Sequence, residues 1–151
     1  MTLSDASLLS HGNFIDDLNE EYDESDTKKL PDLKGYFSIP TIGWNWGHLH
    51  RYNAVDVAGS CGESIYAAAE GTVKEVKEGW NGGYGNYILI SHPNGTLTKY
   101  AHNKKNLVVL DQYVLRGDLI AHIGNTGNTH GETGCHLHFE VYGAKNPFAS
   151  R

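Results

Sequence analysis

The sequence predicts an all-β, β-rich fold built from an antiparallel sheet or sandwich, and three observations support this. Short apolar or alternating segments recur at intervals of roughly ten residues, with turn residues between them. Glycine is frequent, at 18 of 151 residues, which is typical of a fold with many turns. The chain also lacks the long 3.6-residue periodicity of amphipathic helices and the strand–helix–strand spacing of a parallel sheet.

Acidic residues gather at the start of the chain. Residues 1–34 contain nine Asp and Glu against three Lys, a charge of −6, and the whole chain also has a formal net charge of −6. We therefore expect residues 1–34 to be an acidic, disordered leader or linker and residues 35–151 to form one folded domain. Because residues 35–151 balance to zero, they lack the positive charge that nucleic-acid binding requires.

The sequence shows neither a membrane span nor an export signal. No apolar run approaches the roughly 18–20 residues that a span needs. The first residues also lack the charged and then apolar pattern of a signal peptide. Either the protein stays inside the cell, or its export signal lies upstream of Met1.

Four strands are expected in the first half of the domain. Residues 36–39 form a short apolar run. Residues 54–57 are also β-like, and the lone Asp56 within them needs a partner to offset the cost of its burial, unless it caps a turn. A short apolar strand follows at 64–68, and residues 71–76 alternate clearly between polar and apolar.

The second half of the domain begins with a predicted hairpin. Residues 87–92 and 96–102 flank Pro93-Asn94-Gly95, a strong hairpin signal. On the second arm, alternation places His102 on the same face as Tyr100. Further short strands are expected at 108–110 and 119–123.

The last expected strand, residues 134–141, suggests a metal site. As a strand it would place His136, His138 and Glu140 on one face and apolar residues on the other. Two imidazoles side by side on an open strand face suit a metal ion and its reacting water, although a pair of histidines is weak evidence by itself. The strength of the hypothesis depends on what other segments supply.

Other segments do offer the remaining groups of a catalytic zinc site. Such a site typically takes three N or O ligands and keeps a fourth position open. Asp56 and His138 can provide two ligands, and His48 or His50 lies close enough upstream of Asp56 to provide a third. The remaining pair, His102 and His136, would then face the open position and handle protons.

The chain resembles the lysostaphin-type zinc metallopeptidases from about Gly35 to Phe148. The resemblance is carried by Asn-Ala-Val-Asp-Val-Ala at 53–58, Ala-Ala-Ala-Glu-Gly-Thr-Val at 67–73, Gly-Gly-Tyr-Gly-Asn at 82–86, Tyr-Ala-His at 100–102, Gly-Asn-Thr-Gly at 124–127 and Gly-Cys-His-Leu-His-Phe-Glu at 134–140. It implies a zinc-dependent endopeptidase, with Asp56 and His138 as zinc ligands and His102 and His136 as catalytic residues.

One position departs from the family pattern. The usual first ligand is a histidine four residues before the aspartate, and here that residue is Tyr52. We expect His50 to replace it, with His48 as second choice, because a phenol pKa near 10 makes a tyrosinate ligand costly. An extended run of six residues would span about 20 Å, so the chain must bend between His50 and Asp56. Asn53 is the expected place for the bend.

Two further departures lie just before the histidine pair. Cys135 stands where the family often has proline, and the connection at 128–133 is longer than usual. His130 in this connection could contact substrate, with an ordinary surface histidine as the alternative. Glu140 is expected to orient a ligand histidine, with an exposed strand glutamate as the alternative.

The resemblance implies a function and a location. The expected activity is hydrolysis of peptidoglycan, in its stem or cross-bridge peptides, by a metal-activated water outside the cytoplasm, in the cell envelope, the periplasm or the medium. The alternative is a metal-free relative that binds cell wall or activates another hydrolase. Tyr52 favours the alternative, whereas the presence of Asp56, His102, His136 and His138 favours the enzyme.

Cys61 and Cys135 are predicted to form a disulfide beside the site. If Asp56 and His138 share one ion, their strands are neighbours, and the two cysteines lie close to those strands in sequence. A bridge requires Cα atoms about 4.4–6.8 Å apart, which such neighbours can meet. Two separate buried cysteines are the alternative, and a cysteine ligand is weaker because three ligands are already available. A disulfide would fit an oxidising compartment.

Overall fold

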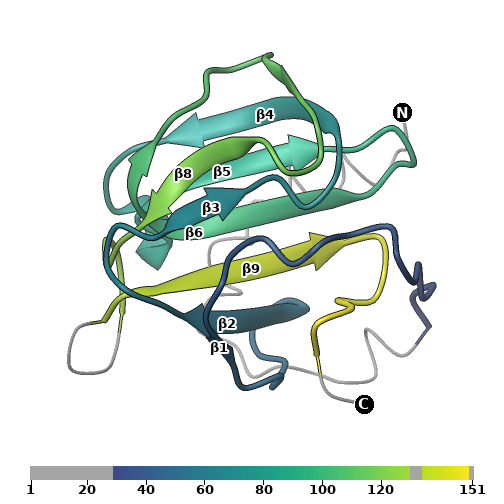
Figure 1. Ribbon diagram of the computed structural model, residues 1–151, viewed down its shortest axis with the longest axis horizontal. Helices are drawn as coiled ribbons and strands as arrows, with labels where there is room; N and C mark the ends of the chain where they lie inside the picture. The colour runs from purple at the N-terminus through teal and green to yellow at the C-terminus, as the bar shows by residue number, and fades with distance from the viewer. Residues whose placement is uncertain (1–28, 130–133, 150–151) are drawn as a thin grey trace.

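An antiparallel nine-stranded sheet dominates the computed structural model, which describes residues 29–129 and 134–149 (Figure 1). The all-β prediction is therefore confirmed. The strands are β1 (Trp44–Asn45), β2 (Ala54–Ala58), β3 (Ser64–Tyr66), β4 (Gly71–Lys77), β5 (Asn86–Ser91), β6 (Leu97–Asn106), β7 (Tyr113–Val114), β8 (Leu119–Ile123) and β9 (His136–Tyr142), with a short 3₁₀ turn, η2 (Asn81–Gly83), before β5. In the part of the chain that is described, no helix has the length and apolarity needed to cross a lipid bilayer.

The strand order places β9 in the middle of the sheet. The main path runs β1-β2-β9-β6-β5-β4-β7, and β8 pairs with both β6 and β3. Figure 1 shows β9 lying between β2 and β6. The register sets Asp56 of β2 opposite His138 of β9, and Ala101 of β6 on the other side of His138. Three segments that are far apart in the chain thus meet around one histidine.

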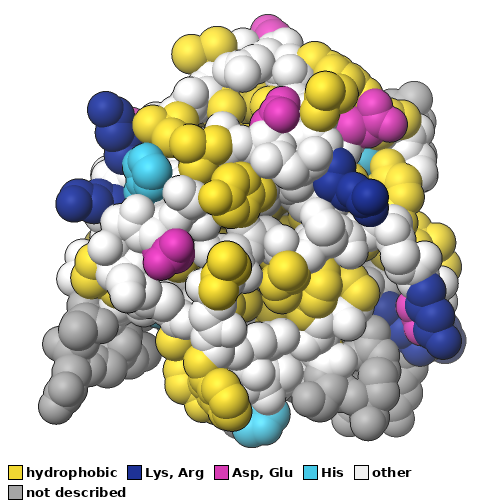
Figure 2. All heavy atoms as spheres, in the orientation of Figure 1, with side chains coloured by type: hydrophobic (Ala, Val, Ile, Leu, Met, Phe, Trp, Pro, Cys, Tyr) yellow, Lys and Arg dark blue, Asp and Glu magenta, His cyan; other side chains and the backbone are white. Residues whose placement is uncertain are grey.

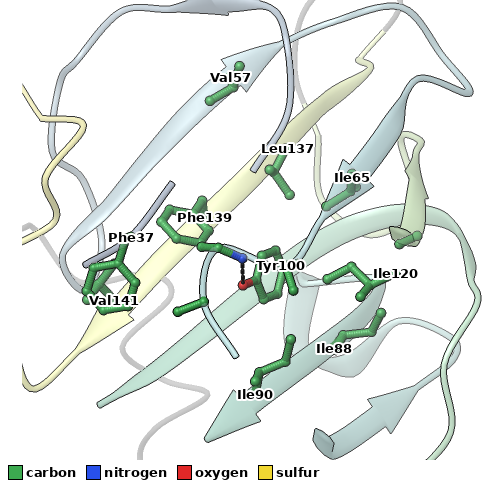
Figure 3. Close-up of a cluster of buried hydrophobic side chains, with 14 of the residues drawn as sticks. Phe37, Val57, Ile65, Ile88, Ile90, Tyr100, Ile120, Leu137, Phe139 and Val141 are labelled. Atoms are coloured by element: carbon green, nitrogen blue, oxygen red, sulfur yellow. Dashed lines mark hydrogen bonds between the residues drawn. The ribbon is translucent and has the colours of Figure 1, made fainter. Parts of the chain in front are cut away.

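The hydrophobic core covers one face of β9. Leu137, Phe139 and Val141 alternate along the strand and are fully buried. Figure 3 shows them beside Tyr100 and the isoleucines of neighbouring strands, with Ile65 and Ile120 contributed by β3 and β8. The Tyr100 hydroxyl accepts a hydrogen bond of 2.9 Å from the backbone N–H of Ala68 (Figure 3). Because side chains alternate along a strand, the polar residues of β9 occupy its opposite face.

Two predicted strands are wrong. Residues 36–39 form no ladder; Phe37 is instead buried against His92, so the apolarity of the segment serves packing. Residues 108–110 also lie outside the sheet, with Val109 67% exposed, and the strand of this region is β7 at Tyr113–Val114. In both cases a run of apolar residues does not establish that its backbone pairs.

The predicted disulfide is confirmed. Cys61 and Cys135 are bonded, with Cα atoms 5.3 Å apart and a sequence separation of 74. Cys135 directly precedes β9, and Cys61 follows β2. The bond therefore joins the segments that flank these two paired strands.

Charged side chains show no single-sign concentration on the visible face. Figure 2 shows Lys and Arg scattered near Asp and Glu, with apolar side chains between them. Most of the predicted acidic leader, residues 1–28, lies outside the described residues, so the boundary near residue 35 stays a prediction.

Candidate metal centre

Strand pairing places Asp56 and His138 side by side. The two residues are direct partners in the β2–β9 ladder, and facing side chains of a ladder lie within contact distance. Nδ1 of His138 lies 3.1 Å from Oδ1 of Asp56. The His138 side chain is 2% exposed and that of Asp56 31%. The aspartate therefore sits where the buried polar face of β9 reaches the surface.

A tight hairpin folds His50 back onto this pair. The backbone N–H of His50 donates to the Ala54 carbonyl at 3.0 Å, and the Ala54 N–H donates to the His50 carbonyl at 3.1 Å. Within the three-residue loop, Arg51 and Asn53 have left-handed φ angles of 48° and 49°. The predicted bend, including its position at Asn53, is confirmed. Nε2 of His50 consequently lies 3.0 Å from Oδ1 of Asp56.

The Asn53 side chain fastens the hairpin to the end of β9. Its Nδ2 donates to the carbonyls of Val141 and Ala144, at 2.8 and 2.7 Å. The side chain of Asn146 in turn donates to the Asn53 carbonyl at 3.0 Å. Asn53 and Asn146 are fully buried, so these hydrogen bonds satisfy polar groups that would otherwise be costly to bury. The sequence offered no signal for Asn146 as a partner.

Tyr52, which stands at the usual first-ligand position, packs against an aromatic side chain of β9. Its ring packs against that of Tyr142, with centroids 5.0 Å apart, next to Leu89 and Leu97. His48, the second choice as ligand, is exposed. The described residues that bring one ligand atom each within 4.8 Å of one another are His50, Asp56 and His138. This is the set expected from the sequence, and its role as ligands stays a prediction.

The chemistry of these three residues fits a zinc ion. Nε2 of His50 is buried and forms no hydrogen bond with any described atom, although Asp56 lies beside it. A buried nitrogen without a hydrogen bond is costly, but it is what an ion would use. Two imidazoles and a carboxylate are also a typical ligand set of catalytic zinc, which keeps a fourth position for water or substrate.

A β-bulge brings His102 to the same place. Ile88 of β5 pairs with Tyr100 of β6, whereas Asn86 pairs with Asn103, so β6 carries an extra residue between these pairs. His102 lies in this bulge with a φ of 66°. The prediction that His102 shares the face of Tyr100 is therefore wrong, because the bulge interrupts strict alternation.

The two expected catalytic histidines lie together. The rings of His102 and His136 have centroids 4.8 Å apart. Nδ1 of His102 lies 2.7 Å from the Thr126 carbonyl, and Nδ1 of His136 lies 3.1 Å from the Gly134 carbonyl. Because a carbonyl only accepts hydrogen bonds, both Nδ1 atoms donate. In the neutral rings, Nε2 is then left as the acceptor, and Nε2 of His136 lies 3.7 Å from Asp56.

Burial and neighbouring charges shift the pKa values of His102, His136 and Asp56. Burial and the adjacent His138 and His136 lower the pKa of His102 to about 3. Burial also lowers the pKa of His136, against the opposing effect of Asp56. For Asp56, burial opposes ionisation, but the adjacent His138 and His50 bring its pKa below its ordinary value. The site thus combines an ionised carboxylate with two histidines that are neutral near pH 7.

Glu140 lies directly behind His138. It is fully buried, so the alternative of an exposed strand glutamate is wrong. Its Oε2 lies 2.8 Å from Nε2 of His138 and accepts a 2.8 Å hydrogen bond from the Tyr84 hydroxyl, while the Tyr142 hydroxyl donates to its Oε1. Burial alone would raise the pKa of Glu140, but His138 and the nearby Lys99 bring it down to about 2.

The partners of Glu140 were missed from the sequence. Tyr142 continues the alternation of β9, and Lys99 is the cross-strand partner of Glu140, so strand pairing would have identified both. Tyr84 comes from the segment between η2 and β5, and no local pattern indicates its contact. His130, the candidate substrate contact, lies outside the described residues.

Comparison with known families identifies relatives of this chain. The family model described as "Peptidase family M23" matches residues 50–150. Peptidoglycan DD-endopeptidase ShyB of Vibrio cholerae is 34% identical over 149 residues, which cover 94% of this chain and 33% of that protein. Murein hydrolase activator NlpD of Escherichia coli is 41% identical over 115 residues, which cover 69% of this chain and 29% of that protein. The chain thus spans about a third or less of the length of these curated relatives.

Solved structures share the fold. A zinc-containing peptidase from Vibrio cholerae matches with a TM-score of 0.55 and 31% identity, covering 81% of this chain and 35% of that one. The catalytic domain of lysostaphin from Staphylococcus simulans matches with a TM-score of 0.55 and 28% identity, covering 78% of this chain and 85% of that one. The predicted resemblance to lysostaphin-type peptidases is confirmed.

Proposed function

The chain belongs to peptidase family M23, and from this premise we propose that it is a zinc-dependent endopeptidase that hydrolyses peptide bonds in bacterial peptidoglycan. The observation that carries the proposal is the convergence of His50, Asp56 and His138 within 4.8 Å. His102 and His136 lie next to this group, with His102 5.7 Å from His138 between ring centroids. Ligands and proton-handling groups are therefore combined in one place.

Each residue has a distinct role in this proposal. His50, Asp56 and His138 would hold the ion, which when bound makes water a stronger nucleophile and polarises a carbonyl. His102 and His136 are neutral and present Nε2 as an acceptor. They can orient the attacking water, accept its proton, and as imidazolium donate to the developing oxyanion. Their backbone hydrogen bonds at Nδ1 fix the rings in the orientation that this requires.

Relatives and the disulfide indicate the substrate and its location. ShyB and ShyC of Vibrio cholerae are named peptidoglycan DD-endopeptidases, so the proposed substrate is a peptide of peptidoglycan, either stem or cross-bridge. The Cys61–Cys135 bond fits an oxidising compartment, because disulfides are rare in the cytosol. Both features favour action outside the cytoplasm.

Activation of another hydrolase is the second candidate function. The similarity to the murein hydrolase activator NlpD supports it, as does the tyrosine at the usual first-ligand position. The position of His50 favours the enzyme, because the hairpin brings its imidazole next to Asp56 although Tyr52 occupies the usual first-ligand position in the sequence.

Digestion of purified peptidoglycan, followed by mass analysis of the products, tests the proposal. We expect the zinc-loaded protein to release peptides with new termini. His102→Ala should retain zinc and lose about 10²–10⁴-fold in turnover, as expected for a proton-transfer group. If the zinc-loaded protein leaves peptidoglycan intact but stimulates a separate hydrolase, the activator hypothesis is correct. If His136→Ala loses zinc and His138→Ala keeps it, the roles of these two histidines are reversed.

A further inference from the structure

His138 lies between two carboxylates. Asp56 is 3.1 Å from its Nδ1, and Glu140 is 2.8 Å from its Nε2. A neutral imidazole has one N–H donor and one nitrogen with a free lone pair. The nitrogen that carries the proton therefore decides whether Nδ1 can bind a metal ion.

Glu140 is positioned to determine which nitrogen of His138 carries the proton. Its carboxylate is fully buried and receives hydrogen bonds from the hydroxyls of Tyr84 and Tyr142. An ionised carboxylate only accepts hydrogen bonds, so its contact with His138 requires a proton on Nε2. Asp56 is 31% exposed, so water can satisfy its carboxylate, and it needs the proton less than the fully buried Glu140 does.

Lys99 supplies a positive charge next to Glu140. The two residues are direct partners in the β6–β9 ladder, and Lys99 is 2% exposed. Nζ lies 3.9 Å from the centroid of the Tyr84 ring and 4.8 Å from that of Tyr87. Aromatic faces stabilise a cation held in this way. The lysine therefore offsets the charge of a carboxylate whose unpaired burial would be strongly unfavourable.

We propose that Glu140, with its charge offset by Lys99, is a positioning residue that keeps the His138 proton on Nε2 and leaves Nδ1 free to bind metal. The inference rests on the proposed zinc site, but it concerns a property that the protein has without metal. It extends to Tyr84, whose ring contacts Lys99 and whose hydroxyl holds Glu140.

Side-chain NMR of the histidine nitrogens in metal-free protein is the direct test. Burial lowers the pKa of His138, but the adjacent Asp56 and Glu140 raise it above its ordinary value, so the spectra are recorded at a pH high enough to give the neutral ring. We then expect His138 to carry its proton on Nε2. In Glu140→Gln, the amide can donate as well as accept, so a substantial Nδ1–H fraction should appear. Zinc affinity, measured by competition with a chelator, should fall about 10–100-fold, as for other residues that orient metal ligands.

Glu75→Gln is the matched control. Glu75 accepts a 2.8 Å hydrogen bond from the Tyr87 hydroxyl, so the same substitution there removes a similar pair without touching His138. It should leave the tautomer and the zinc affinity unchanged. Tyr84→Phe and Tyr87→Phe form a second, milder comparison, because each removes only the hydroxyl that bonds to a glutamate and keeps the ring. Only Tyr84→Phe should weaken zinc binding.

The outcomes separate this inference from the proposed function. A wild-type His138 that carries its proton on Nδ1, or a Glu140→Gln protein with unchanged tautomer and zinc affinity, would overturn the positioning role. If Glu140→Gln does not fold, the Tyr84→Phe comparison decides by the same two measurements. Should zinc bind as expected without any peptidoglycan cleavage, the enzyme proposal fails and the positioning role stands.

Discussion

Nε2 of His50 lies 3.0 Å from Oδ1 of Asp56, although the two residues are six positions apart in the chain. In an extended strand they would be separated by about 20 Å. The hairpin closed by His50 and Ala54 reverses the chain within three residues, and this brings His50 next to Asp56. A histidine outside the usual spacing can therefore reach the site.

The zinc content of His50→Ala should be far below that of the wild type. The change removes one of three proposed ligands, and two ligands hold zinc much more weakly. Metal analysis of protein purified without chelator measures this. His48→Ala is the control, because His48 is exposed and lies outside the group of three. Equal zinc in both variants would exclude His50 as a ligand.

Asn53→Ala should lower the free energy of unfolding by about 2–4 kcal/mol. Alanine disfavours the left-handed φ of 49°, and the carbonyls of Val141 and Ala144 lose their donor. Urea unfolding measures the change. Asn53→Gly should cost less, because glycine tolerates the backbone conformation and only the hydrogen bonds are lost. A larger loss for glycine than for alanine would contradict this explanation.

Stability should fall as the pH drops below about 6.5, and His92 should contribute to this fall. Burial lowers the pKa of His92 from its ordinary value of 6.5. Nδ1 donates to the Glu70 carbonyl at 2.6 Å, and Nε2 lies 2.9 Å from Oγ1 of Thr98. Below pH 6.5 the unfolded chain takes up the proton more readily than the folded protein, so the stability present above 6.5 is lost as the pH falls towards the lower folded pKa.

Urea unfolding of His92→Phe between pH 7.5 and 5 isolates this contribution. The variant should be less stable at pH 7.5, because Glu70 and Thr98 lose their partner. Its stability should nevertheless decline less steeply with falling pH than that of the wild type. Parallel pH profiles for the two proteins would show that His92 is not the titrating group.

Loss of the Cys61–Cys135 bond should lower the free energy of unfolding by about 4 kcal/mol, since cross-linking a loop of this length restricts the unfolded chain by that amount. The double variant Cys61→Ala, Cys135→Ala is the comparison, with denaturant unfolding as the measurement. Because the bond joins the segments that flank β2 and β9, which carry Asp56 and His138, zinc affinity should also weaken. An unchanged midpoint would mean that the bond does not stabilise the fold.

Much of the fold and site follows from local patterns. Alternation along β9 correctly separates His138 from Phe139, and the alternating run at 71–76 is a strand. The position of His102 could not be derived in this way, because a bulge depends on how β6 pairs with β5. The same limit applies to Tyr84, which reaches Glu140 across 56 positions of sequence. Local periodicity therefore identifies strands and faces, whereas bulges and long-range contacts require the pairing of strands.

The central position of β9 also determines when this protein can fold. β9 is the last described strand to be synthesised, yet it fills the gap between β2 and β6. Until it emerges, both neighbours have open edges, and unpaired edges promote aggregation. Pairing β2 with β9 closes a long loop, which slows folding. The nascent chain must therefore remain unaggregated until β9 emerges, and it cannot assemble the three-residue group of His50, Asp56 and His138 before then.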